Sequence, residues 1–345
     1  GQGFANAVGM AMAESHLAAR FNRAAHAVVD HHTYVMCGDG DLMEGVAAEA
    51  ASLAGHLGLG KLICIYDDNG ISIEGSTAIA FTEDVALRFE SYGWQVLTVA
   101  DGNDLQAISG AIEAARAETE KPSLIKLKTE IAYGSPNKQG TADAHGAPLG
   151  EEELALTKQN LGLPVDEPFL VPDAVRAHFE GCRTAGEKAE AAWLTAFKAY
   201  KDDHPELAEQ WVDAMSGFLP EDWQADIPAF SPGEGPIATR AASGQVLNAL
   251  AAKVPTLIGG SADLAPSNKT YLTCSHEFQR DAYDGRNIRF GVREHAMGAI
   301  MTGMFLHNGL RPYGGTFLVF ADYVRPAIRV ASLMLSLIHI SEPTR

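Results

Sequence analysis

The chain has 345 residues, of which 46% are hydrophobic, and its 26 basic and 44 acidic side chains give a formal net charge of −18. This length accommodates two domains of ordinary size, each with its own core. The acidic balance argues against nucleic acid or an anionic membrane as partners, although a few local cations would still hold a phosphate. The sequence contains no run of about 18 apolar residues, so no membrane span is predicted.

Helical and strand patterns alternate through the first half of the chain. Strands are predicted at 33–37, 62–66, 94–99 and 123–128. Helices are predicted at 5–23, 42–57, 83–91 and 104–117. Such alternation predicts a mainly parallel sheet with helices on both faces, which we assign to a first domain, 1–205.

The composition changes after Glu151. The pattern at 187–208 is charged and helical, with Trp193 and Phe197 on one side, and several prolines follow it. Proline breaks long elements, so 206–236 is predicted to be a linker with helical pieces.

A second α/β pattern occupies 237–334. Helices are predicted at 239–250 and 295–307, strands at 256–260 and 287–290, and a strand or a strand-to-helix turn at 315–320. The fold class predicted for the whole chain is α/β, with two tandem three-layer domains and mainly parallel sheets.

Four cysteines, Cys37, Cys64, Cys182 and Cys274, are scattered without C-x-x-C spacing. The first two fall inside predicted core strands, where a free thiol behaves as a small apolar group. This distribution predicts no disulfides and a reducing, cytoplasmic location.

Oxygen-bearing side chains follow two of the predicted strands of the first half. Asp39 lies in the turn after the strand at 33–37, and Asn69 lies in the Asp-Asp-Asn-Gly turn after the strand at 62–66. The carboxyl ends of parallel strands form the ligand-binding edge of a sheet, and a helix amino terminus there attracts phosphate. A hard cation such as Mg²⁺ prefers oxygen ligands and bridges carboxylates to phosphates. Asp39, Asn69 and the backbone carbonyl of Ile71 are therefore predicted metal ligands.

Ordinary turn chemistry is the alternative for each turn, because Gly, Asn and Asp dominate turns for backbone reasons. The occurrence of both turns, separated by one strand-helix-strand unit, favours a diphosphate-bound metal site.

The same stretch resembles the thiamine diphosphate motif, with GDG at 38–40 and DN at 68–69, and its surroundings resemble transketolase. Asp68 stands where the general motif usually has Asn. Five further segments resemble transketolase in the family's order: GQGFANAVGMAMAE from Gly1, GSPNKQGTADAHGAPLG from Gly134, GGSADLAPSN from Gly259, GVREHAMGAI from Gly291 and LRPYGGTFLVFADY from Leu310. The resemblance extends from Gly1 to about Leu335 and is weakest between 166 and 236.

The resemblance implies a thiamine diphosphate-binding fold, with a diphosphate-binding domain at 1–205 and a pyrimidine-binding domain at 237–334. It implies reversible transfer of a two-carbon ketol group from a ketose phosphate, such as xylulose 5-phosphate, to an aldose phosphate through a thiamine diphosphate enamine. It also implies Mg²⁺, with Ca²⁺ or Mn²⁺ as alternatives, and a homodimer whose active sites lie at the subunit interface.

Individual roles are implied in the same way. Glu294 and His145 would be catalytic, the first beside the pyrimidine N1′ and the second as a proton carrier. Arg240 and Ser267, with His145, would bind the sugar phosphate. Cofactor contacts are implied for Gly40, Glu44, Asn69, Ile73, His145, Asp263, Glu294, Phe317, Phe320 and Tyr323.

Several of these residues have simpler explanations. Glu294 and Glu44 would suit the first turn of a helix as acids favoured by the helix dipole. Arg240 would be a surface helix residue, and the aromatic spacing of Phe317, Phe320 and Tyr323 is typical of core packing. Resemblance favours the functional roles.

Other functions remain as alternatives. Close relatives that use formaldehyde as acceptor, the dihydroxyacetone synthases, share most of these motifs. A non-catalytic transketolase-like interaction protein is a further alternative, against which Asp39, Asn69 and Glu294 argue. A dinucleotide-binding dehydrogenase is disfavoured because Gly1-x-Gly3 lacks a third glycine at the required spacing.

Both ends of the chain depart from the family pattern. The resemblance begins in mid-motif at Gly1, so the family's opening segment is predicted to be absent. The closing segment 335–345, LSLIHISEPTR, resembles a translated sequencing adapter and is predicted to be a non-native tail. A fragment of this kind is expected to bind cofactor poorly and to be inactive by itself.

Overall fold

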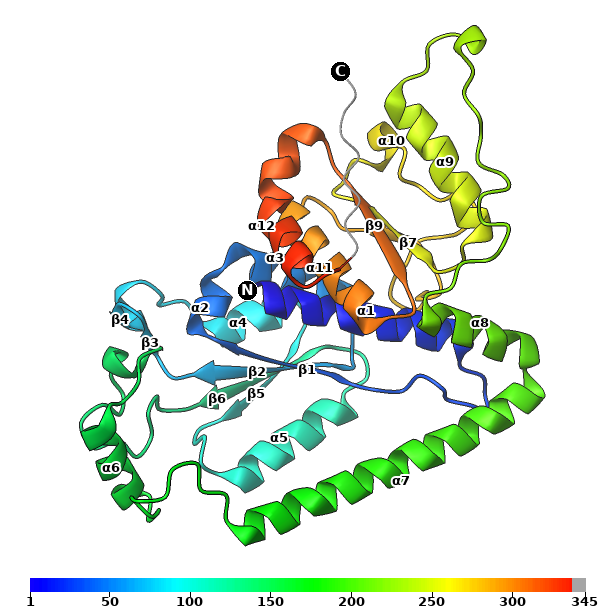
Figure 1. Ribbon diagram of the computed structural model, residues 1–345. Helices are drawn as coiled ribbons and strands as arrows, with labels where there is room; N and C mark the ends of the chain where they lie inside the picture. The colour runs from blue at the N-terminus through cyan, green and yellow to red at the C-terminus, as the bar shows by residue number, and fades with distance from the viewer. Residues whose placement is uncertain (337–345) are drawn as a thin grey trace.

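Two parallel sheets organise the part of the chain that the computed structural model describes, residues 1–336 (Figure 1). The first has the strand order β1-β2-β6-β5 and the second the order β8-β7-β9. The strands of the first sheet are β1 (Thr33–Gly38), β2 (Leu62–Asp68), β5 (Gln95–Val99) and β6 (Ser123–Lys128). All their pairings are parallel, which confirms the predicted α/β class. Most of the predicted tail, 337–345, lies outside the described residues.

Helices cover both faces of the first sheet. Figure 1 shows α5 (Leu105–Ala117) on one face, and α1 (Gln2–Phe21), α3 (Gly45–Leu57) and α4 (Val85–Ser91) on the other. Aspartate side chains start two of these helices. Asp84 accepts a hydrogen bond from the Leu87 N–H at 3.1 Å, and Asp104 accepts from the Gln106 N–H at 3.0 Å. Such caps satisfy amide groups that the first helical turn leaves unpaired.

The second sheet contains β7 (Leu257–Ser261), β8 (Asn287–Arg289) and β9 (Arg311–Gly315). Its helices α11 (Glu294–His307) and α12 (Ala321–Leu333) lie on one side, with α9 (Thr239–Lys253) on the other (Figure 1). Both pairings of β7 are parallel, as the alternation of elements predicts.

The two sheets are joined by helix packing between α1 and α11. A Cβ atom on Gly9 would lie 2.0 Å from the Ile300 carbonyl oxygen, and one on Gly303 would lie 1.9 Å from that of Asn6. Only glycine permits this approach of the two backbones. A single buried apolar cluster therefore runs from the first sheet through α1 into α11.

Two predicted helices are each divided in the structure. The helix predicted at 42–57 is α2 (Asp39–Met43) followed by α3, with Glu44 extended between them at φ −68° and ψ 130°. The helix predicted at 187–208 is the end of α7 (Asp173–Asp203) and the start of α8 (Pro205–Ser216). Pro205 has no N–H for the ladder, and His204 before it leaves the helical region at ψ 62°.

The strand predicted at 315–320 is wrong, whereas the alternative of a strand-to-helix turn there is confirmed. The strand is β9, which ends at Gly315, and a 3₁₀ turn η4 (Leu318–Phe320) leads into α12. The sequence Arg-Pro-Tyr-Gly-Gly obscures this strand because Pro and Gly weaken a strand pattern. Pro312 is tolerated because β9 is an edge strand of its sheet.

The segments around these layers are short or lie at the periphery. They comprise β3 (Ile71–Ser72), β4 (Gly75–Ser76), η1 (Thr77–Ile79), η2 (Ala142–Ala144), α6 (Glu151–Asn160), η3 (Pro232–Glu234) and α10 (Ala265–Asn268). On α7 the rings of Trp193 and Phe197 stack with centroids 5.1 Å apart, which confirms that they share a face. Within residues 1–336 no helix combines the length and apolar character needed to cross a membrane.

All four cysteines are free thiols. Cys37 on β1 and Cys64 on β2 are buried, with their sulfur atoms 3.3 Å apart. Their core positions are as predicted.

Candidate functional site

A cavity of about 920 Å³ opens at the carboxyl edge of the first sheet. We call it the diphosphate-end cavity. Seven of the predicted site residues line it: Asp39, Gly40, Glu44, Asn69, Ile71, Ile73 and His145. They come from the turns after β1 and β2, the hairpin β3–β4 and the segment between β6 and α6. The parallel sheet brings these turns together because its strand ends share one edge.

Asp39 is held by two hydrogen bonds and is 4% exposed. Its Oδ1 accepts from the Tyr66 hydroxyl at 2.6 Å, and its Oδ2 accepts from the Gly70 N–H at 3.1 Å. Burial raises the pKa of the Asp39 carboxyl, and the two hydrogen bonds oppose that rise. The bond from Gly70 ties Asp39 directly to the turn that carries Asn69.

Asn69 occupies a turn of its own. Its Oδ1 accepts from the Ile71 N–H at 2.9 Å, and its Nδ2 donates to Asp67 Oδ2 at 3.3 Å. Thr129 at the end of β6 donates its hydroxyl to the other oxygen of Asp67. The amide of Asn69 is thus oriented by neighbours on two strands.

The charge of the diphosphate-end cavity bears on what it can hold. Six carboxylates line it, and its lining includes no Lys or Arg side chain: the six are Asp39, Asp41, Glu44, Asp67, Glu74 and Glu130. A diphosphate anion would be repelled here unless a divalent cation entered with it. The oxygen-rich donor set therefore fits a hard metal ion bound together with a diphosphate.

Clusters of three or more His, Cys, Asp or Glu side chains are the usual mark of a metal site built from protein side chains alone. Within residues 1–336 no three His, Cys, Asp or Glu side chains are grouped so as to hold an ion. The predicted shell contains only one carboxylate, Asp39, with the Asn69 amide and the Ile71 carbonyl. Diphosphate oxygens and water would have to complete it, as is usual for Mg²⁺.

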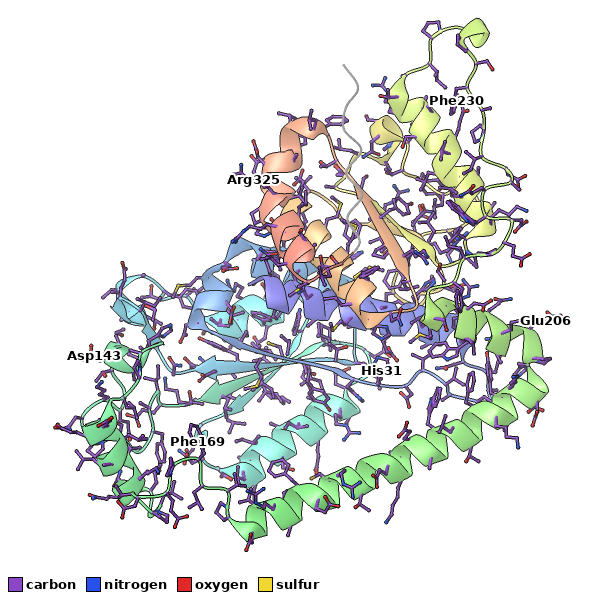
Figure 2. The ribbon with its side chains drawn as sticks, in the orientation of Figure 1. His31, Asp143, Phe169, Glu206, Phe230 and Arg325 are labelled. Atoms are coloured by element: carbon purple, nitrogen blue, oxygen red, sulfur yellow. The ribbon has the colours of Figure 1, made fainter. Side chains whose placement is uncertain are left out.

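His145 follows η2 in the segment between β6 and α6. Figure 2 labels the neighbouring Asp143, which lies near the β3–β4 hairpin. The His145 side chain is exposed and makes no hydrogen bond or ion pair within the described residues. The imidazole is therefore free to meet a ligand in the cavity.

The remaining seven predicted residues lie on the second half of the chain and do not line the diphosphate-end cavity. Glu294 is the first residue of α11 and only 8% exposed, yet its carboxylate has no hydrogen-bond or ion-pair partner among residues 1–336. The oxygens of this carboxylate are not among the fully buried side-chain atoms that lack a partner, so solvent still reaches them. Glu294 does begin a helix, as its simpler explanation expects, and its cofactor role stays a prediction.

Phe317, Phe320 and Tyr323 form a continuous aromatic row. Successive ring centroids are 6.2 Å apart in both pairs. Phe317 is 40% exposed and Tyr323 is 64% exposed, so the alternative of core packing is wrong for these two rings, whereas Phe320 is half-buried between them. The turn from β9 into α12 places these rings on the surface.

The other three residues are exposed. Asp263 has φ of 60°, a strained backbone region for a residue other than Gly, in the loop after β7. Arg240 lies in the first turn of α9 and Ser267 lies in α10. A second cavity of about 630 Å³ lies beside α9, but neither Arg240 nor Ser267 lines it.

Sequence reasoning missed two residues around the diphosphate-end cavity. Tyr66, which is 2% exposed, was assigned only to a strand core, yet its hydroxyl reaches Asp39. Glu153 on α6 was not considered, yet it binds the segment that carries His145. The signal for Tyr66 is the parallel register of β1 and β2, which pairs Tyr66 with Cys37 and so places it close to Asp39, two residues after Cys37 along the chain.

Comparison with known proteins agrees with this arrangement. Residues 1–220 match the family model for the transketolase thiamine diphosphate binding domain, and residues 235–340 match that for the transketolase pyrimidine binding domain. A transketolase of Geobacillus stearothermophilus is 55% identical over 335 residues, which cover 97% of this chain and 50% of that protein. A chloroplastic transketolase of Arabidopsis thaliana is 52% identical, over 96% of this chain and 45% of the relative.

Solved structures show the same likeness. The transketolase of Leishmania mexicana superposes with a TM-score of 0.93 at 46% identity, over 96% of this chain and 49% of that one. A transketolase of Pichia stipitis in complex with sedoheptulose 7-phosphate also gives 0.93, at 45% identity, over 96% of this chain and 50% of that one. The chain spans about half the length of the relatives it matches. From its two matched domains and this identity, the chain belongs to the transketolase family.

Proposed function

We propose that this chain forms part of a transketolase that moves a two-carbon ketol group between sugar phosphates. The observation that carries this proposal is the convergence of seven residues from four separate segments on one acidic, oxygen-rich cavity. A ketose phosphate such as xylulose 5-phosphate would be the donor and an aldose phosphate the acceptor. We propose a diphosphate-binding domain at 1–205, a linker at 206–236 and a pyrimidine-binding domain at 237–334.

Thiamine diphosphate, when bound, supplies a nucleophilic thiazolium carbon that accepts and returns the ketol group. In the diphosphate-end cavity Asp39, Asn69 and the Ile71 carbonyl would hold Mg²⁺, with Ca²⁺ or Mn²⁺ as substitutes. Ile73, which is 77% exposed at the cavity, would offer an apolar contact to the thiazolium ring. His145 would carry protons at the reacting end of the substrate, because an imidazole can both accept and donate a proton.

The second half of the chain would bind the pyrimidine end. Glu294 would lie beside the pyrimidine N1′, since its carboxylate makes no hydrogen bond or ion pair within residues 1–336. The exposed aromatic row would receive the aminopyrimidine ring, with Phe317 as the stacking residue. Asp263 would border the cofactor and the substrate hydroxyls.

Arg240 and Ser267 would bind the terminal phosphate of the sugar. A guanidinium forms paired hydrogen bonds with phosphate, and both side chains are exposed. The sugar phosphate in the Pichia stipitis structure supports this substrate class.

The separation of the two groups of residues supports a homodimer, which the family resemblance implies. Since the aromatic row and Glu294 do not line the diphosphate-end cavity of their own chain, a second copy would supply them. We place the enzyme in the cytoplasm, in accord with its free thiols.

A chimeric enzyme tests the proposed function. Residues 1–336 would replace the matching part of the Geobacillus stearothermophilus transketolase, to which the chain is 55% identical. We expect the chimera to transfer a ketol group from xylulose 5-phosphate to ribose 5-phosphate, and EDTA to abolish this activity until Mg²⁺ is restored. The 345-residue chain alone is expected to show no turnover.

The acceptor distinguishes the alternatives. Preference of the chimera for formaldehyde would assign the chain to the dihydroxyacetone synthases. A folded, dimeric chimera without activity towards either acceptor would favour a non-catalytic interaction protein.

A further inference from the structure

The segment between β6 and α6, residues 129–150, forms one wall of the diphosphate-end cavity. Thr129, Glu130, Ile131 and Ala132 line the cavity at its start, and His145 and Gly146 line it near its end. Apart from the single 3₁₀ turn η2, the segment has no regular structure. Because the His145 side chain has no partner within residues 1–336, its position depends on how the backbone of this segment is held.

Glu153 on α6 holds the middle of that segment. Its Oε1 accepts hydrogen bonds from the Ser135 hydroxyl and, at 2.9 Å, from the Asn137 N–H. Its Oε2 accepts from Asn137 Nδ2 at 2.8 Å. Glu153 is 8% exposed. These bonds, the one from Ser135 above all, lower the pKa of the Glu153 carboxyl to about 2, so it is ionised at neutral pH.

Further bonds connect the turn at 135–138 to the part of the segment that carries His145. Lys138 Nζ donates to the Leu149 carbonyl oxygen at 3.0 Å, and the Lys138 N–H donates to Ser135 Oγ at 3.3 Å. Thr141 donates its hydroxyl to the Lys138 carbonyl oxygen at 2.8 Å. The backbone on both sides of His145 is thereby tied to the turn that Glu153 holds.

A simpler role for Glu153 would be that of an acid in the first turn of a helix. Glu151 and Glu152 occupy the same turn of α6 and satisfy that preference, and both are exposed. Only Glu153 faces inward and binds three donors outside its own helix. Its contacts therefore serve the segment rather than the helix end.

We infer that Glu153 is a positioning residue that sets the place of His145 in the cavity by clamping the turn at 135–138. This inference rests on the proposed function for the role of His145. The clamp itself is independent of any cofactor, so the two can be tested separately.

Hydrogen–deuterium exchange of the 345-residue chain without ligand tests the clamp. Glu153→Ala leaves the Ser135 hydroxyl and both Asn137 donors unpaired, so exchange in residues 134–150 should rise about tenfold. Glu152→Ala, which removes an exposed carboxylate from the same turn, should leave exchange unchanged. Unchanged exchange in Glu153→Ala, or an equal rise throughout the first sheet, would overturn the clamp.

A reciprocal exchange of side chains provides a rescue. Asn137→Asp alone places two carboxylates against each other and should also speed exchange. Combined with Glu153→Gln it reverses the roles of donor and acceptor, since the new amide can donate to the new carboxylate and its oxygen still accepts from Ser135 and the 137 N–H. We expect the double variant to restore slow exchange, and a failure to do so would overturn this hydrogen-bond assignment.

The positioning role is read from the His145 imidazole. The His145 Cε1–H proton resonance of the chimeric enzyme, assigned with a His145→Gln variant, would be followed during titration with thiamine diphosphate and MgCl₂. Glu153→Ala should weaken this response about tenfold, and the double variant should recover it. If Glu153→Ala speeds hydrogen–deuterium exchange but leaves the response of His145 to thiamine diphosphate unaltered, the positioning role is overturned. A wild-type resonance that ignores thiamine diphosphate would overturn the proposed function, while the ligand-free exchange result would still decide the clamp.

Discussion

The diphosphate-end cavity and the aromatic row differ in how far one chain completes them. Around the cavity, Asp39 and Asn69 are already oriented by Tyr66, Gly70 and Asp67. On the second half, Phe317 and Tyr323 of the aromatic row are exposed and the Glu294 carboxylate has no partner among the described residues. The side chains of the first region are oriented by contacts within the chain, whereas Glu294 and the exposed rings of the second region lack such contacts among the described residues.

The largest expected effect is at Asp39. Asp39→Asn removes the charge that would face the proposed metal ion but keeps the side-chain shape, and the Tyr66 hydroxyl can still pair with the amide. We expect affinity for Mn²⁺ in the presence of thiamine diphosphate, measured by electron paramagnetic resonance, to fall by about two orders of magnitude or more. Asp101→Asn, an exposed carboxylate beyond the end of β5, is the control. Equal Mn²⁺ affinity in the Asp39 variant and wild type would show that the diphosphate-end cavity does not bind the metal through Asp39.

The next effect concerns the contact between the two halves. His16 on α1 is buried with Nδ1 2.8 Å from the Tyr283 carbonyl oxygen, and burial lowers its pKa to about 4. Below about pH 6.5 the His16 imidazole of the unfolded chain binds a proton, whereas the buried imidazole of the folded chain stays neutral down to about pH 4. The free energy of unfolding therefore decreases as the pH falls from 7 towards 4. We expect this group to remove roughly 2–3 kcal/mol between pH 7 and 4.5.

Urea unfolding at the two pH values measures this loss. His16→Asn keeps an amide donor for the Tyr283 carbonyl but cannot titrate, so its stability should fall less over the same range. An identical pH dependence in both chains would show that His16 is already protonated in the folded state.

A smaller effect is expected for Tyr66. Tyr66→Phe deletes the hydroxyl that orients Asp39, and we expect about a tenfold loss of Mn²⁺ affinity. Tyr200→Phe is a matched control, because Tyr200 is also buried and donates one hydrogen bond, to the Phe21 carbonyl at 2.9 Å, far from the cavity. Both variants should lose about 1 kcal/mol of stability, and only the first should lose metal affinity. Equal metal affinity in the two would assign Tyr66 to the core alone.

The smallest effect tests the second region. Phe317→Ser should leave the unfolding free energy within about 0.5 kcal/mol of wild type, because the ring is 40% exposed. If a second copy covers the aromatic row, the dimer dissociation constant from sedimentation should rise about fivefold. Phe179→Ser on α7, where the ring is 65% exposed, is the control and should leave self-association unchanged. A loss of folding stability would mean that the row packs within its own chain.

Local pattern was sufficient to predict most elements and one half of the site. Residues 123–128 form β6 as predicted, and Asp39 and Asn69 line the same cavity because each follows a parallel strand. The strand at 311–315 could not be recognised, because Pro312 and two glycines carry no strand pattern and only pairing with β7 defines it. The break at Glu44 was missed for a similar reason, since neighbouring residues there still favour a helix.

The sequence by itself determined the order of α and β elements, the two polar strand ends and the acidic balance of the chain. The first two depend on residues close to one another in sequence. Contacts between distant residues were decided only by tertiary structure: the Tyr66 bond to Asp39, the Glu153 clamp, the glycine-mediated packing of α1 on α11 and the exposure of the aromatic row. The physical reason is that backbone preference and side-chain period act over a few residues. A hydrogen bond or a close helix approach depends on packing that brings together residues far apart in the chain.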